Sequence, residues 1–162
     1  MLQWLVNNWI GVLSTALGGV LVWFITYWIG KPIVDVRDKR IKALHAAEQN
    51  AHVGYAATDE RIVAARTALN EAASALRAVS RGHGWPVRVY CWLARYDLEA
   101  AAYALISLHN KTGHPHYDDK TRQLVLDGIY LFLRAHKHLS LKRINEINEQ
   151  IERDKRLHEA EL

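Results

Sequence analysis

The chain begins with an apolar run that contains no charged side chain. Residues 1–30 have no Asp, Glu, Lys or Arg, so all 21 basic and all 17 acidic residues fall in residues 31–162. A helix over residues 9–29 rises about 1.5 Å per residue and measures about 30 Å, which is the thickness of a bilayer core. We therefore predict a transmembrane anchor within residues 1–32.

Aromatic side chains bracket this run. Trp4 and Trp9 stand at one end, and Trp23, Tyr27 and Trp28 stand at the other. Indole and phenol rings prefer the headgroup level, where the ring is buried and its polar group meets water. A cleaved signal peptide would begin with basic residues, and this run does not. A monotopic helix would need a strongly polar face, which is absent here. A buried helix of a soluble domain would seldom lack charged residues over this length. The pattern therefore favours a helix that crosses the bilayer.

Basic residues follow the apolar run, whereas no ionisable side chain precedes it. These basic residues are Lys31, Arg37, Lys39, Arg40 and Lys42. Because positively charged flanks remain on the cytoplasmic side, we expect the N-terminus outside and the C-terminal domain in the cytoplasm. The expected location is a bacterial-type inner membrane, in a single-pass topology, with the basic cluster against anionic lipid headgroups.

Small residues repeat along one row of the apolar run. Gly11, Thr15 and Gly19 are spaced by four, which places them on one face of a helix. Small residues at this spacing allow two membrane helices to approach closely, so the row predicts a homo-oligomer formed through the helix. The alternative is chance, since Gly is common in membrane helices.

The rest of the chain has helical periodicity and no convincing strand pattern. We expect a juxtamembrane helix over residues 33–57, a helical bundle over residues 58–151 and a charged, solvated tail over residues 152–162. Residues 119–139 are apolar nearly all round in their middle and are expected to be the central core helix. The predicted fold class is all-α, with one N-terminal transmembrane helix followed by a small helical bundle.

Several apolar stripes define the helices of this bundle. The first stripe consists of Ile62, Ala65, Leu69, Ala72, Leu76 and Val79. Pro86 suits the first turn of a second helix, and Asp97 is expected to cap a third. The expected apolar face of the second is Val87, Tyr90, Cys91 and Leu93, and that of the third is Leu98, Ala101, Leu105 and Leu108.

Charge and cysteine content exclude some classes of protein. The net charge is +4, without a dense Lys/Arg stripe and interleaved aromatic residues, so we expect no nucleic-acid partner. The single cysteine, Cys91, cannot form an internal disulfide, which suits a reducing compartment. In apolar surroundings its thiol is expected to be inert packing rather than a nucleophile.

The best candidates for metal binding are His114 and His116. Side chains two apart in an extended chain share a face, so the two imidazoles could chelate an ion together with Asp118 or Asp119. The alternative is a polar loop whose aspartates cap the next helix. This set falls short of a defined metal site, and the sequence has no Gly-rich phosphate loop, His-Glu-x-x-His or Gly-x-Ser-x-Gly motif. We therefore expect no cofactor and no enzymatic activity.

Two parts of the chain resemble a group of short, uncharacterised bacterial and prophage proteins. The first is GKPIVD at residues 30–35, directly after the Trp-bounded apolar segment. The second is YDLEA at residues 96–100, followed by LISLHN at residues 105–110. Proteins of that group carry one N-terminal membrane helix and a helical cytoplasmic domain, so the resemblance implies the same layout here. It implies no activity and no functional residues.

These features predict a membrane-tethered helical interaction module, which binds the lipid bilayer and either a partner protein or itself. An alternative of a different class is an oligomerising membrane effector of a phage-defence or toxin-like kind, which would act through Gly11, Thr15 and Gly19. A third alternative is a metal-dependent hydrolase at His114 and His116.

Overall fold

The computed structural model describes residues 2–54, 56–82, 84–114, 119–134 and 141–160. The helices are α1 (Leu2–Phe24), the π-helical turn η1 (Ile25–Gly30), α2 (Lys31–Asn50), α3 (Asp59–Gly82), α4 (Trp85–Ala94), α5 (Leu98–Lys111), α6 (Asp119–Phe132) and α7 (Leu141–Ala160). Every regular element in the described ranges is a helix, which confirms the predicted all-α class.

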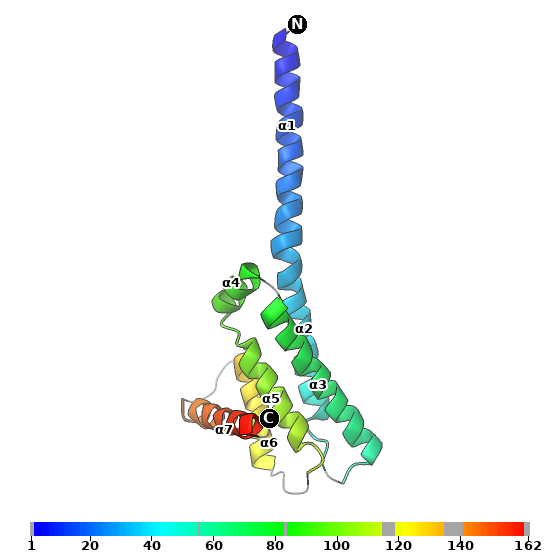
Figure 1. Cartoon of the computed structure of the whole chain (residues 1–162), viewed down its shortest axis with the longest axis vertical. Coiled ribbons are helices and arrows are strands. Elements are labelled where there is room, and N and C mark those ends of the chain that lie inside the picture. The colour runs from blue at the N-terminus through cyan, green and yellow to red at the C-terminus, as the bar shows by residue number, and fades with distance from the viewer. Residues whose placement is uncertain (1, 55, 83, 115–118, 135–140, 161–162) are drawn as a thin grey trace.

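The predicted anchor and the first part of the predicted juxtamembrane helix form one continuous helix of α1, η1 and α2 (Figure 1). This helix ends at Asn50, before the predicted end at residue 57. Pro32 lies near its middle and has no N–H to donate to the preceding turn, which would kink a regular α-helix. Here the turn before it widens instead, because the Lys31 N–H bonds to the carbonyl of Thr26, five residues back. The helix therefore passes through Gly30-Lys31-Pro32 without ending.

The bundle is built around α5, which contacts α2, α3, α6 and α7. The pairing of α3 with α5 is the most extensive, and α2 packs mainly against α3. All four residues of the predicted α5 stripe are buried, namely Leu98, Ala101, Leu105 and Leu108. The sequence predicts a central helix within residues 119–139, of which the structure describes 119–134. Helix α6 in this range is well buried, but α5 has more helical neighbours, so α5 is the central helix and the prediction is wrong on this point.

Helix α7 continues through most of the stretch that the charge pattern predicts to be a solvated tail. Its apolar residues Ile147 and Ile151 are buried against the bundle. Beyond them, the Asp154 carboxylate accepts hydrogen bonds from the Ser107 hydroxyl and, at 2.7 Å, from the Lys111 ammonium group, both on α5. These contacts hold α7 against α5 at Asp154, so the packing of α7 on the bundle extends past residue 151.

Candidate functional site

The first half of the long helix stands away from the bundle (Figure 1). We call its residues 9–30 the stalk. It belongs to the one helix in the described part of the chain that is long and apolar enough, by length and composition, to cross a membrane. None of its most apolar stretch is buried, and Leu17, Val20 and Leu21 are all more than half exposed. An apolar surface of this length is costly in water, so the stalk is the first candidate functional surface.

Aromatic rings gather where the stalk meets α2. Trp23 stacks on Tyr27 with ring centroids 5.5 Å apart, and Phe24 stacks on Trp28 at 5.7 Å. The Lys31 ammonium group lies 4.9 Å from the centroid of the Tyr27 ring. Four of the five predicted interface aromatics, Trp9, Trp23, Tyr27 and Trp28, are exposed, whereas the side chain of Trp4 lies outside the described part. The junction therefore presents rings with a cation beside them, which suits a boundary between hydrocarbon and water.

The small residues of the stalk lie on an open face. Gly11, Thr15 and Gly19 are all exposed, and a Cβ atom built on either glycine would meet nothing within 4 Å. The hydroxyls of Ser14 and Thr15 each donate to the Gly11 carbonyl at 2.9 Å. The row therefore offers a flat surface whose hydroxyl donors are already satisfied within the helix.

The predicted lipid-binding cations are not gathered in one place. Arg40 turns into the bundle, where its Nε donates to the Leu133 carbonyl at 2.6 Å and its guanidinium lies 5.2 Å from the Tyr96 ring centroid. Arg37 and Lys42 are exposed on α2. Arg40 thus joins α2 to the end of α6, and lipid contact by the other predicted cations stays a prediction.

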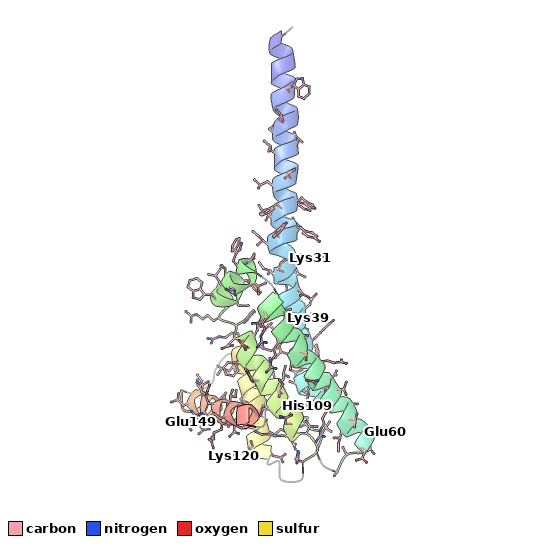
Figure 2. The ribbon with its side chains drawn as sticks, in the orientation of Figure 1. Lys31, Lys39, Glu60, His109, Lys120 and Glu149 are labelled. Atoms are coloured by element: carbon pink, nitrogen blue, oxygen red, sulfur yellow. The ribbon has the colours of Figure 1, made fainter. Side chains whose placement is uncertain are left out.

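The predicted cations also lie at different distances from the stalk. A helix rises about 1.5 Å per residue, so Lys39 lies about 12 Å and Lys42 about 17 Å beyond Lys31 along the axis. Figure 2 shows Lys31 at the junction with the stalk and Lys39 well below it, beside α3. Charges more than about 8 Å apart are largely screened at physiological salt, so Lys31 is the best placed of the group.

Helix α4 lies beside the same junction, at the end of the bundle nearest α1 (Figure 1), and contacts both η1 and α2. One of its faces packs inward, through the buried Val87 and the partly buried Tyr90 and Cys91. The opposite face is also apolar. It consists of Trp85, Val89, Trp92 and Leu93, which are 66%, 44%, 77% and 67% exposed. We call these four residues the outer face of α4.

The prediction that Leu93 belongs to the inward face of its helix is therefore wrong. Apolar residues surround most of α4, so hydrophobic periodicity could not decide which of them would be covered. A second indication was present in the sequence, because two of the six tryptophans fall within these ten residues. Exposed tryptophan near both ends of a short helix indicates a surface that contacts something other than water.

A groove of about 300 Å³ lies between the start of α4 and the end of the stalk. Phe24, Tyr27 and Trp28 line one wall, and Trp85 and Pro86 line the other. The lining is almost entirely apolar and aromatic, and it joins the outer face of α4 to the aromatic end of the stalk. Trp85 therefore lies beside the aromatic end of the stalk.

Among the residues that the structure describes, no three His, Cys, Asp or Glu lie close enough to hold a metal ion. His114 is exposed, whereas His116 lies outside the described residues, and Asp119 is paired with Arg122 at 2.9 Å. Burial raises the pKa of the Cys91 thiol, and Asp97 raises it further, so the reactive thiolate is disfavoured.

Comparisons with known protein families, with curated proteins and with solved structures find no match for this chain. The stalk, α4 and the groove between them are the features of this chain that bear on its function.

Proposed function

We propose that the protein is a membrane-tethered helical interaction module, in which the stalk crosses the bilayer and holds the bundle at its cytoplasmic face. The observation that carries this proposal is the contrast along one unbroken helix. Its stalk exposes Leu17, Val20 and Leu21, whereas α2 buries Val36, Ala43 and Ala47 completely. Each half is therefore suited to a different surrounding, hydrocarbon for the stalk and a protein core for α2.

Continuity of the helix supports a tether that positions the bundle. A flexible linker would let a domain diffuse over a wide volume, whereas a helix fixes both distance and direction. The cations that follow the stalk, with none preceding it, support an inward C-terminal domain by the positive-inside rule. The bundle would then meet its protein partner, or a second copy, close to the membrane surface.

Extraction and labelling of the full-length chain test this proposal. We expect the protein to remain in the membrane pellet after alkaline carbonate washing, because a transmembrane helix is held by hydrocarbon and not by charge. For topology, Glu60→Cys in a Cys91→Ser background places a thiol at the exposed start of α3. We expect a membrane-impermeant maleimide to label it in opened cells only. Release of the protein by carbonate would overturn the tether, and labelling in intact cells would overturn the orientation.

Self-association through the stalk is the second candidate function, corresponding to an oligomerising membrane effector. The observation that favours it is the open row of Gly11, Thr15 and Gly19. Small residues at such rows let two helix backbones approach closely, which favours association in lipid. We expect Gly19→Ile to lose energy transfer between labelled copies in vesicles, while Leu21→Ile, which keeps the row intact, retains it. Equal transfer in both variants would remove this candidate, as would a Gly19→Ile variant that still dissipates the membrane potential when overexpressed.

A further inference from the structure

The outer face of α4 is a second apolar surface beside the stalk, and the tether leaves it unexplained. Trp85, Trp92 and Leu93 are each about two-thirds exposed or more. Covering these side chains with the rest of the bundle is excluded, because the opposite face of α4, with Val87 at its centre, already packs there. The outer face therefore needs a surrounding of its own.

The position of α4 indicates what that surrounding is. Trp85 and Trp28 line opposite walls of the same groove, so the start of α4 lies level with the aromatic end of the stalk. If the stalk crosses a bilayer, its aromatic end lies at the headgroup region of the cytoplasmic leaflet. The start of α4, with Trp85 of its outer face, then reaches the same depth.

The charges on α4 and at its C-terminal end are all positive, which suits contact with anionic lipid headgroups. Helix α4 contains no acidic residue, and its single charged side chain, Arg88, is exposed beside the outer face. Arg95, the C-cap of α4, is exposed as well. Exposed tryptophan with arginine at its margin suits the headgroup level of a membrane. The inward face of α4 packs on the bundle, so the bundle takes the place of the polar face that a free interfacial helix would need. Arginine can at the same time meet the phosphates of anionic headgroups.

We propose that α4 is an interfacial helix that inserts its outer face into the cytoplasmic leaflet, with the groove beside the stalk filled by a lipid acyl chain. This inference rests on the proposed function, because it needs the stalk in the same membrane. The bundle then contacts the bilayer at two places. A single transmembrane helix would leave the bundle free to rotate about the stalk axis, whereas two contacts fix which of its surfaces faces the cytoplasm.

Depth-dependent quenching in vesicles tests this proposal on the full chain. The vesicles contain phosphatidylcholine and phosphatidylglycerol, with a nitroxide on the acyl chains as the quencher. One fluorophore is attached to a single cysteine in the Cys91→Ser background, introduced as Trp92→Cys, Val20→Cys or Val63→Cys in separate proteins. Val63 is the matched control, because it is an apolar residue, 61% exposed, near the start of α3. Figure 2 shows Glu60, in the same part of α3, at the end of the molecule away from the stalk.

We expect quenching at positions 20 and 92 to be several-fold stronger than at position 63. Strong quenching at 20 with only the background level at 92 would overturn the interfacial helix and leave the tether intact, and the outer face would then be a surface for a protein. Background quenching at all three positions would overturn the tether itself. A further variant, Trp85→Gln/Trp92→Gln/Leu93→Gln with the fluorophore at Val89→Cys, should lose quenching while position 20 keeps it. Retained quenching at 89 in that variant would also contradict the proposal.

Discussion

In residues 13–28 of the long helix, which precede Lys31, every side is exposed and mostly apolar. In α2, which begins at Lys31, the exposed positions are mostly charged or polar. The buried positions of α2 are occupied by small residues, namely Val36, Ala43 and Ala47, none of which has exposed surface. One backbone thus carries two kinds of surface, and only the side chains change. The difference shows that one continuous helix can expose apolar residues along one half and bury them in a bundle along the other.

Small residues four apart occur in both halves, with different outcomes. In α2, Ala43 and Ala47 are fully buried where the helix packs mainly against α3. In the stalk, Gly11 and Gly19 frame an equivalent row that nothing covers. The comparison indicates what the open row is suited to, namely close contact with another helix.

The largest expected effect comes from placing charge in the stalk. Leu17→Arg/Val20→Arg puts two guanidinium groups on exposed positions near the middle of the apolar run. Each arginine at the centre of a membrane helix costs about 2.5–3.5 kcal/mol of insertion free energy, so the pair costs about 5–7 kcal/mol. We expect most of the double variant to be lost from the carbonate-resistant membrane fraction.

The matched control lies on the other half of the same helix. Ile41 is an apolar residue of α2 that is 40% exposed, and Ile41→Arg should leave the membrane fraction unchanged. Loss of both proteins from the membrane would mean that arginine disrupts folding in general. Retention of both would contradict the difference between the two halves.

A second pair of variants places the same substitution in each half. Ala47→Leu forces three extra carbons into a fully buried contact, which typically costs about 1–3 kcal/mol of unfolding free energy. Ala16→Leu adds the same volume to an exposed position of the stalk. In mild detergent, we expect the bundle's thermal unfolding midpoint to fall for Ala47→Leu by about 4–8 °C per kcal/mol lost, and to stay constant for Ala16→Leu. Equal midpoints in the two variants would show that α2 is packed less tightly than its burial indicates.

Much of the bundle could be predicted from the sequence because its stripes are local and periodic. The α5 stripe is buried as predicted, and the Asp97 carboxylate caps α5 by accepting the Ala100 N–H at 2.9 Å. The α3 stripe is confirmed at Ala65, Leu69, Leu76 and Val79, which are all buried. A stripe every three to four residues needs no knowledge of the partner helix.

The features that could not be predicted depend on contacts between distant residues. The sequence around Asp154 predicts a solvated tail, because its partners Ser107 and Lys111 lie on another helix, more than forty residues away in the chain. Arg40 looks like one more cation after the apolar run, yet carbonyl groups more than ninety residues away, at Leu133 and Arg134, receive its hydrogen bonds. Likewise, the exposure of Leu93 follows from where α4 lies against the bundle. None of these pairings leaves a periodic trace in the sequence.

A third prediction separates two arginines of α2 that look equivalent in sequence. Arg40→Gln removes the guanidinium that bonds to the Leu133 carbonyl, and we expect it to cost about 1 kcal/mol of unfolding free energy, because the partly buried carbonyl loses a charged donor. Arg37→Gln changes an exposed side chain and should alter stability by less than about 0.5 kcal/mol. Chemical unfolding in detergent measures both. A larger loss for Arg37→Gln than for Arg40→Gln would contradict the assignment of Arg40 to the bundle.

The smallest expected effect concerns the contact between α2 and α6 at high pH. The Tyr130 hydroxyl donates to the Glu48 carboxylate at 2.9 Å, and burial, together with this carboxylate, raises the pKa of Tyr130 to about 12. An unfolded tyrosine ionises near pH 10, so this contribution to stability is complete below pH 10 and is lost as the pH rises towards 12. We expect Tyr130→Phe to unfold with a weaker pH dependence in that window than the parent chain. In Glu48→Gln, we expect the pKa of Tyr130, followed by tyrosinate absorbance, to fall only part of the way towards its ordinary value, because burial is the larger cause of the raised pKa. A full return to the ordinary value would assign the shift to the carboxylate instead.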